Sequence, residues 1–342
     1  MYDKVRRRLE SQFEKAELMG ACLVPTCSND ARALRSAAED VSNIRTMDYK
    51  KETCHSGEYV SPFPGLYLRG AYWLGLREDE AALHVIKGLA LKYPTWTFCS
   101  HSAALLYGID VSWELLNEIH LACPRGGRAR NRRGIIHHSL DVGTVSYPNG
   151  VRAVDVREAV FSSLCSVPFG LGLGIVDSAL RMRYVTKEGM EAYCDVIGKG
   201  RRGITRARVA ISFADGRAEN GGESRARAVM IEEGFAPHEL QVSFRDPIDP
   251  SRVMRGDFGW RYEDGSWAIG ELDGKQKYED ARYMNSDDPV GVMMAERRRE
   301  SRMSAYGVRI MRFPMQYVYD RWKLVELMQA YGIPRSPIPF IP

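Results

Sequence analysis

The sequence predicts an α+β protein made of three parts, and three observations support this fold class. Apolar residues recur at helical spacing near the start of the chain, at Val5, Leu9 and Phe13. Residues 154–215 have the pattern of a mainly helical segment. Beyond residue 215, strand-like runs alternate with turn signals, as in a small sheet. We therefore divide the chain into a region 1–140, a helical connector 141–215 and a C-terminal α/β region 216–342.

The region 1–140 is predicted to mix short helices with short strands. Its expected elements are helices over the first residues, from about 31, over 81–92 and over 100–107, and strands at 59–61, 65–69, 118–122 and 134–138. His101, at the start of one of these helices, has two interpretations. It acts at a site, or it caps and packs between two segments, and we favour packing.

The connector contains the longest uncharged run of the chain, Ala159 to Val176. Its length approaches that of a membrane span, but it contains Pro168 and three glycines. We interpret it as a buried helix that is broken at the proline. Thr186 is the predicted N-cap of a following helix.

A β-hairpin is predicted around Asp264-Gly265. If the loop has three residues, with Gly265 in the left-handed conformation, Tyr262 pairs with Ser266. The same register places Asp257 directly opposite Glu271, with Cβ atoms about 4.5–5.5 Å apart. A two-residue turn would shift the register by one and separate the two carboxylates.

Carboxylates would then gather on one face of this hairpin. Asp273 lies two residues beyond Glu271 and points the same way, while Phe258, Gly270 and Leu272 point to the other face. Carboxylates packed this closely repel each other, and a divalent cation is the usual means of neutralising them.

The order of predicted elements over residues 219–331 resembles the core of the PD-(D/E)XK nuclease superfamily. A helix carrying Glu223 is followed by a strand, the strand of Asp257, a strand with Glu271-Leu272-Asp273-Gly274, and then helix, strand and helix. The likeness is greatest to the branch near the very-short-patch-repair endonucleases. It implies a restriction-endonuclease-like α/β core in which Asp257 and Glu271 hold Mg²⁺ or Mn²⁺. The metal activates a water against a phosphodiester, and Glu223 is an outer ligand or base.

One position departs from that family. Its usual lysine lies two residues after the strand carboxylate, where this chain has Asp273, so Lys275 or Lys277 would have to supply the positive charge. The catalytic candidates are Glu223, Asp257, Glu271, Asp273, Lys275 and Lys277. The alternative is a degenerate nuclease fold that serves as a scaffold or binding surface.

The N-terminal part resembles the AbiEi-type antitoxin family over residues 30–215. The likeness rests on Gly65-Leu66-Tyr67, on the segment from Cys99 to Gly108 and on Ile119-His120-Leu121-Ala122. It implies an N-terminal winged helix-turn-helix and a DNA partner. It also raises the rival function, a non-catalytic antitoxin and transcriptional regulator that pairs with a cognate toxin protein.

A basic, glycine-rich segment lies between the strands expected at 118–122 and 134–138, and we predict that it is a hairpin loop. Its five arginines, with no acid among them, are Arg125, Arg128, Arg130, Arg132 and Arg133. Such a loop suits a phosphate backbone, and a solvated surface loop is the alternative. A second basic cluster at Lys199, Arg201, Arg202, Arg206 and Arg208 is equally well explained as an exposed helix face.

The remaining composition predicts a cytoplasmic protein without a membrane partner. The seven cysteines are irregularly spaced and read as reduced thiols, although Cys22, Cys27, Cys54 and His55 form an alternative zinc set. The first residues lack the apolar segment of a signal peptide. A net charge of +4 permits a nucleic-acid partner without requiring one.

Overall fold

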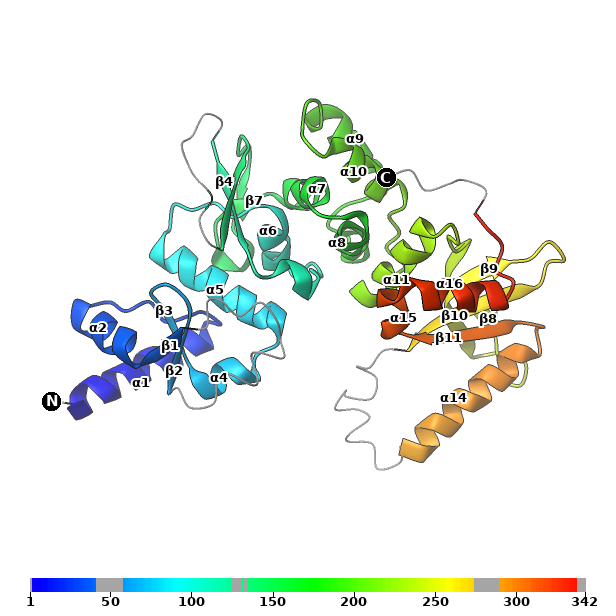
Figure 1. Ribbon diagram of the computed structural model, residues 1–342, viewed down its shortest axis with the longest axis horizontal. Coiled ribbons are helices and arrows are strands. Elements are labelled where there is room, and N and C mark those ends of the chain that lie inside the picture. Colours follow the sequence, from blue (N-terminus) through cyan, green and yellow to red (C-terminus); the bar gives the residue numbers. More distant parts are fainter. Residues whose placement is uncertain (1, 41–57, 125–130, 132–133, 274–288, 337–342) are drawn as a thin grey trace. The chain divides into compact units, whose positions relative to one another are not determined.

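The computed structural model in Figure 1 describes residues 2–40, 58–124, 131, 134–273 and 289–336. The chain forms two compact units, Met1–Ser163 and Leu164–Pro342. Both mix helices with small sheets, so the α+β class is confirmed. The boundary between the units falls inside the predicted connector, and the three-part division of the chain stays a prediction.

The first unit is built of short elements. Its helices are α1 (Tyr2–Leu18), α2 (Ser28–Ala37), α4 (Gly70–Gly75), α5 (Glu78–Lys92), α6 (Ser100–Leu106) and most of α7 (Val156–Ser166). Its strands are β1 (Ala38–Asp40), β2 (Tyr59–Phe63), β3 (Leu66–Arg69), β4 (Ile119–Cys123), β5 (Ile135–Ser139), β6 (Val145–Ser146) and β7 (Ala153–Val154). All the helices and strands expected in this part are present.

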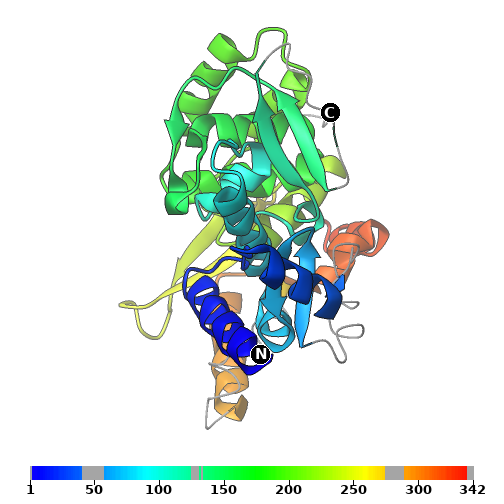
Figure 2. The ribbon, with the colours of Figure 1, turned by 90° about the vertical axis from the view of Figure 1, so that its left-hand side faces the viewer.

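The N-terminal helices pack on a three-stranded sheet of order β1-β2-β3. Leu9 and Phe13 of α1 and Leu34 of α2 are buried with Tyr59 and Tyr67 of the sheet. The rings of Phe13 and Tyr59 stack with centroids 5.0 Å apart. Figure 2 shows α1 and α2, in blue, beside these strands.

The predicted hairpin between residues 118–122 and 134–138 is wrong. β4 and β5 pair in parallel, with Ile119 beside Ile135 and Cys123 beside Ser139. Each strand is only five residues, about 17 Å long, and the connection between them has enough residues to return the chain to the end from which β4 began. The five predicted DNA-binding arginines fall in this connection, outside the described residues.

The second unit begins helical and ends on a sheet. Its helices are α8 (Phe169–Arg181), α9 (Lys187–Ile197), α10 (Ile204–Ser212), α11 (Gly221–Glu232), α14 (Pro289–Ser304), α15 (Met315–Tyr319) and α16 (Arg321–Ala330). Its strands are β8 (Glu239–Arg245), β9 (Val253–Arg261), β10 (Trp267–Asp273) and β11 (Arg309–Pro314). The chain breaks between α7 and α8 at Pro168, and Thr186 caps α9, both as predicted.

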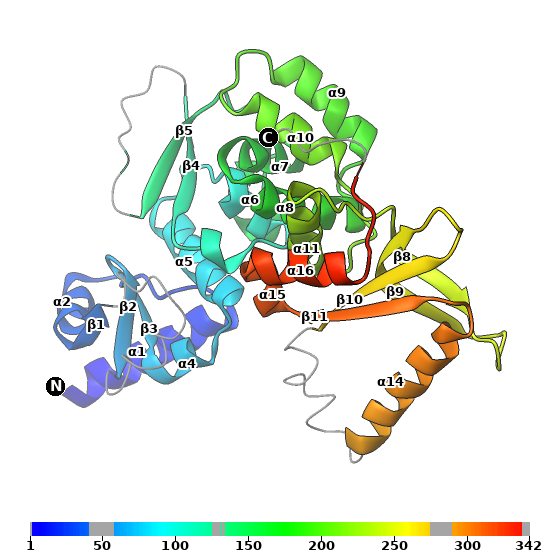
Figure 3. The same cartoon turned by 45° about the vertical axis from the view of Figure 1, so that its right-hand side comes forward.

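The four strands form one mixed sheet of order β11-β10-β9-β8, in which β8, β9 and β10 are antiparallel and β11 runs parallel to β10. Figure 3 shows α11, α15 and α16 on one side of this sheet and α14 on the other. Phe258 and Leu272 are buried on the first side, and Ile269 is buried on the second side with Met303 of α14. The order of elements is the one that the sequence predicts, except that the closing helix is two short helices.

The hairpin between β9 and β10 has the predicted three-residue loop. Gly265 has φ +83°, and the amide of Tyr262 donates to the carbonyl of Ser266 over 2.9 Å. The last regular pair of this ladder is Phe258 with Gly270. The next residue on each strand is Asp257 and Glu271, so these two lie at the same level.

A local distortion interrupts the sheet at this level. Gln241 has φ +54°, a conformation that is costly for a residue with a side chain. On either side of it, Leu240 is buried with Phe258 on the α11 side, whereas Val242 is buried with Ile269 on the α14 side. Regular strands keep residues two apart on one face. The buried side chains of β8 therefore change from one face of the sheet to the other at Gln241, which lies opposite Asp257 of β9.

Candidate functional site

Glu223 lies at the first turn of α11 and is held by the residues that begin this helix. Asn220 is the N-cap, and its side-chain oxygen accepts the Glu223 amide over 3.0 Å. In return, the carboxylate of Glu223 accepts from Asn220 Nδ2 and from the amide of Glu219, both over 2.7 Å. This reciprocal cap fixes the position of the carboxyl group.

The environment of Glu223 favours its neutral form. Burial raises the pKa of Glu223 to about 7, and the negative charge of Asp257 acts in the same direction. Gln241 Nε2 lies 3.3 Å from Glu223 Oε2. The distorted strand, the first turn of α11 and the strand β9 thus bring Gln241, Glu223 and Asp257 to one place.

Asp257 continues the ladder between β9 and β10 with its side chain. Its Oδ2 accepts the amide of Leu272 over 2.9 Å. This contact fixes the carboxylate of Asp257 against the backbone beside Glu271 and orients it at the edge where the regular pairing ends.

Glu271 is neutralised by two arginines from different elements. Arg299 of α14 donates through Nη2 to both oxygens of Glu271, over 2.8 and 2.7 Å. Arg312, the neighbour of Glu271 in β11, donates to Oε2 over 2.8 Å. Arg312 also lies 3.4 Å from Asp273 Oδ1 and 2.5 Å from Glu300 Oε1.

The predicted site residues therefore fall into two groups. Glu223 lies close to Asp257, while Glu271 and Asp273 both contact Arg312 of β11. Lys275 and Lys277 lie outside the described residues. Within the described ranges, no set of three or more His, Cys, Asp or Glu side chains is arranged to hold a metal ion.

Sequence reasoning missed three residues of this site: Gln241, Arg299 and Arg312. Arg299 belongs to the run Arg297–Arg299 of α14, which is typical of a solvated helix face, with a DNA contact as the alternative. Arg297 and Arg298 are exposed as expected, but Arg299 turns inward to Glu271. Arg312 was detectable in principle, because it is the one charged residue inside the otherwise apolar run Ile310–Phe313.

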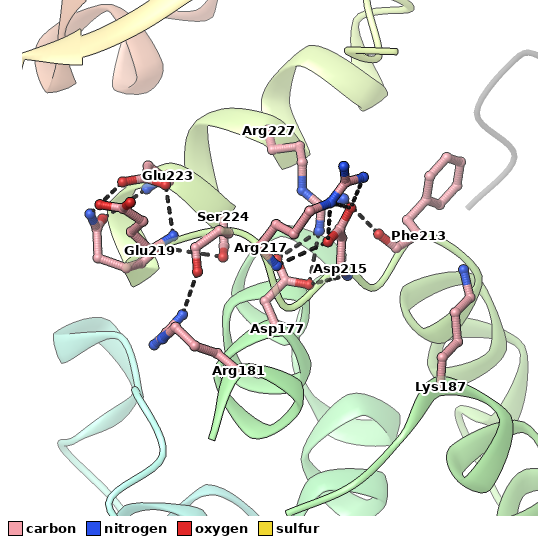
Figure 4. A network of polar contacts seen from close by, with 12 residues as sticks. Asp177, Arg181, Lys187, Phe213, Asp215, Arg217, Glu219, Glu223, Ser224 and Arg227 are labelled. Carbon is pink, nitrogen blue, oxygen red and sulfur yellow. Dashed lines mark hydrogen bonds and ion pairs between the residues drawn. The ribbon is translucent and has the colours of Figure 1, made fainter. Parts of the chain in front are cut away.

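A buried ion pair anchors the middle of α11 (Figure 4). Arg227 Nη2 donates to both oxygens of Asp177 on α8, over 2.8 and 2.7 Å, and Arg227 Nη1 donates to the carbonyl of Phe213 over 2.7 Å. The amide of Asp215 also donates to Asp177. Because Arg227 lies one turn after Glu223, this network fixes the helix that presents Glu223.

An imidazole cluster lies in the core of the first unit. His101 of α6 packs against His120 of β4 with ring centroids 3.8 Å apart, and His120 Nδ1 lies 2.6 Å from Nε2 of His138 on β5. Burial lowers the pKa of His101 to about 4 and that of His120 to about 2. His101 thus joins two segments by packing, which is the interpretation that we favoured.

The alternative zinc set gains no support from the part of the chain that is described. Cys22 is buried in the core of the first unit, and this burial raises the pKa of its thiol, whereas Cys27 is exposed. Cys54 and His55 lie outside the described residues. In the second basic cluster, Arg208 pairs with Asp195 over 2.9 Å at the surface.

Two curated proteins of Mycobacterium tuberculosis are similar to part of the chain. They are the uncharacterized proteins MT2308 (strain CDC 1551 / Oshkosh) and Rv2248 (strain ATCC 25618 / H37Rv), each 33% identical over 180 residues. The match covers 50% of this chain and 64% of each relative. No protein-family model matches the chain, and no solved structure matches it. In the described part of the chain, every helix is too short or too polar to cross a membrane.

Proposed function

We propose that the second unit is a Mg²⁺- or Mn²⁺-dependent DNA endonuclease of the PD-(D/E)XK type. The observation that carries the proposal is the pair of Glu223 and Asp257: the buried carboxyl group of Glu223 on α11 lies close enough to the partly buried carboxylate of Asp257 on β9 for the negative charge of Asp257 to raise its pKa. Two carboxylates held this way favour a bound cation or a shared proton. The predicted order of helix, three antiparallel strands, helix and parallel strand supports the same fold.

The residues present fit a magnesium ion. Mg²⁺ commonly takes one or two carboxylates and completes its shell with water and substrate phosphates, so a set of three protein ligands is not required. Asp257 and Glu271 would hold it at the point where the ladder between β9 and β10 ends. Carboxylates outnumber guanidinium groups in the neighbouring cluster, where Glu271, Asp273 and Glu300 contact Arg299 and Arg312. The bound ion would lower the pKa of a coordinated water and offset charge on the phosphate.

Glu223 is suited to be the general base. A base works best when its pKa is near the working pH, and the pKa of Glu223 is raised to about 7. In the reaction, the water oxygen bonds to phosphorus as Glu223 takes its proton. The bond from phosphorus to the sugar oxygen breaks, and the electron pair leaves with that oxygen, which is then protonated by solvent.

The test is incubation of the pure protein with plasmid and single-stranded DNA in Mg²⁺, Mn²⁺ or EDTA. We expect cleavage with metal and none with EDTA, and a rate that rises with pH up to about 7. Asp257→Asn should remove both cleavage and the rise in melting temperature that millimolar metal causes by binding the native state. A melting curve that metal does not change would contradict the proposal.

One observation favours a second function, a non-catalytic DNA-binding regulator of the antitoxin type with a toxin protein as partner. Glu271 already has two guanidinium partners, and Asp273 occupies the position of the usual lysine. The first unit, with two helices packed on a small sheet, would bind DNA in either case. Metal-independent DNA binding without cleavage would support this regulator.

A further inference from the structure

We propose that Arg312 is the cation that contacts the scissile phosphate, in place of the lysine that position 273 lacks. This inference rests on the proposed function of the site. It assigns a role to a residue of β11 that lies far from Glu271 in the sequence.

The sheet register places Arg312 where such a cation is needed. Arg312 pairs with Glu271 across the parallel strands β10 and β11, and its guanidinium contacts both Glu271 and Asp273. A lysine at position 273 would project from the same face, two residues along β10. The positive charge has thus moved to the neighbouring strand without leaving that face of the sheet.

Arg312 is open to a ligand on one side. Its side chain is 26% exposed, with Nε 2.5 Å from Glu300 Oε1 and Nη2 2.8 Å from Glu271 Oε2. Its Nη1 contact with Asp273, itself 41% exposed, is longer at 3.4 Å. A phosphate oxygen is a stronger partner for that nitrogen than a distant, solvated carboxylate, since guanidinium groups bind phosphate through short, charge-assisted hydrogen bonds. A phosphate would therefore replace Asp273 at Nη1, while Arg312 keeps its contacts with Glu271 and Glu300.

Arg299 has a different role. Its Nη1 donates to the carbonyl of Arg255 over 2.7 Å, and its Nη2 donates to both oxygens of Glu271. These contacts tie α14 to β9 and β10 and hold Glu271 in place. Arg299 is therefore a positioning residue.

The experiment compares Arg312→Gln and Arg312→Lys with Arg309→Gln, which removes the same charge from an exposed residue of the same strand. Binding to a duplex DNA is measured in EDTA at several salt concentrations. We expect Arg312→Gln to lower the slope of log affinity against log salt by about 0.9, the value of one phosphate contact. Arg312→Lys and Arg309→Gln should keep the wild-type slope.

Cleavage gives the second readout. Arg312→Gln should slow single-turnover cleavage by roughly 100-fold or more, as loss of one transition-state donor does, and Arg312→Lys should restore part of the rate. The metal-induced rise in melting temperature should persist in Arg312→Gln, which leaves both contacts between Arg299 and Glu271 in place, and disappear in Arg299→Gln, which removes them.

The outcomes separate this inference from the proposed function. If the wild type binds DNA but never cleaves it, and Arg312→Gln still lowers the salt slope, the nuclease proposal fails and the phosphate contact stands. If Arg312→Gln binds with the wild-type slope, or cleaves at the wild-type rate, Arg312 does not contact the phosphate and the inference is overturned.

Discussion

The imidazole cluster of the first unit and the carboxylate site of the second unit both bury titratable groups of one kind together. His101 and His120 become neutral with little cost near neutral pH, because their lowered pKa values lie well below it. Glu223 is not fully neutral at this pH, since with a pKa of about 7 a fraction of the molecules carries a charged Glu223 beside Asp257. The comparison teaches that like groups in a core need not form a site. A site is indicated where burial and a neighbouring like charge bring the pKa of a group close to the working pH.

The largest expected effect concerns Asp177, a fully buried carboxylate whose arginine partner is buried with it. Arg227→Met should lower the free energy of unfolding by about 3–5 kcal/mol, because it leaves Asp177 charged and unpaired in the core. Urea denaturation measures this loss. The control is Arg208→Met, whose exposed pair with Asp195 contributes about 0–1 kcal/mol. Equal effects of the two changes would mean that burial of the ion pair does not matter.

The imidazole cluster should destabilise the protein toward acid. The folded pKa of His101 is about 4, below its ordinary value, so the unfolded chain binds more protons between pH 6.5 and 4 and stability falls across that window. At about 1.4 kcal/mol per pH unit, the loss is on the order of 3 kcal/mol at pH 4.

Denaturation of the wild type and of His101→Gln at a series of pH values isolates the contribution of His101 to the pH dependence of stability. The difference in free energy of unfolding between them should change by that amount between pH 7 and pH 4. His238→Gln, which replaces an exposed histidine of the other unit, is the control. A difference that does not vary with pH would show that folding does not shift the pKa of His101.

Burial of Glu223 should make the protein less stable as pH rises, which is opposite to the effect of His101, and the change should be smaller. The folded pKa of Glu223 lies above the ordinary value, so the folded protein binds more protons and stability falls as pH rises from about 4.5 through 7. Without metal at pH 8, Glu223→Gln should therefore be more stable than wild type by roughly 1–2 kcal/mol, after allowance for one lost hydrogen-bond acceptor.

The control for this change is Glu219→Gln, an exposed acid just before the same helix. Melting curves in EDTA at pH 5 and pH 8 are sufficient to compare the variants. If Glu223→Gln is less stable than wild type at both pH values, the carboxylate is already balanced by the protein, and the contrast with the imidazole cluster disappears.

Much of the second unit could be predicted from sequence, because local signals determine it. The turn signal at Asp264-Gly265 indicates the hairpin of β9 and β10, and Gly265 sets the length of their loop and so the register of Asp257 and Glu271. The face switch in β8 could not be predicted, since nothing in the sequence indicates that Gln241 adopts a left-handed conformation that favours glycine.

Contacts between separate elements were also beyond sequence reasoning. Arg299 and Arg312 meet at Glu271 only because α14 and β11 pack beside β10. The direction of β5 relative to β4 was predicted wrongly, because the apolar pattern of a short strand is the same in a parallel and an antiparallel pair.

The cap of α11 gives the site a spectroscopic reporter. The amide of Glu219 donates to Glu223 Oε2, so its proton chemical shift should follow the ionisation of that carboxyl group. One backbone resonance would then record the titration of Glu223, its displacement by an added metal ion, and any change that a substitution at Asp177 or Arg227 transmits along the helix. The chemistry of the site could thus be followed in the resting protein, without substrate and before any product forms.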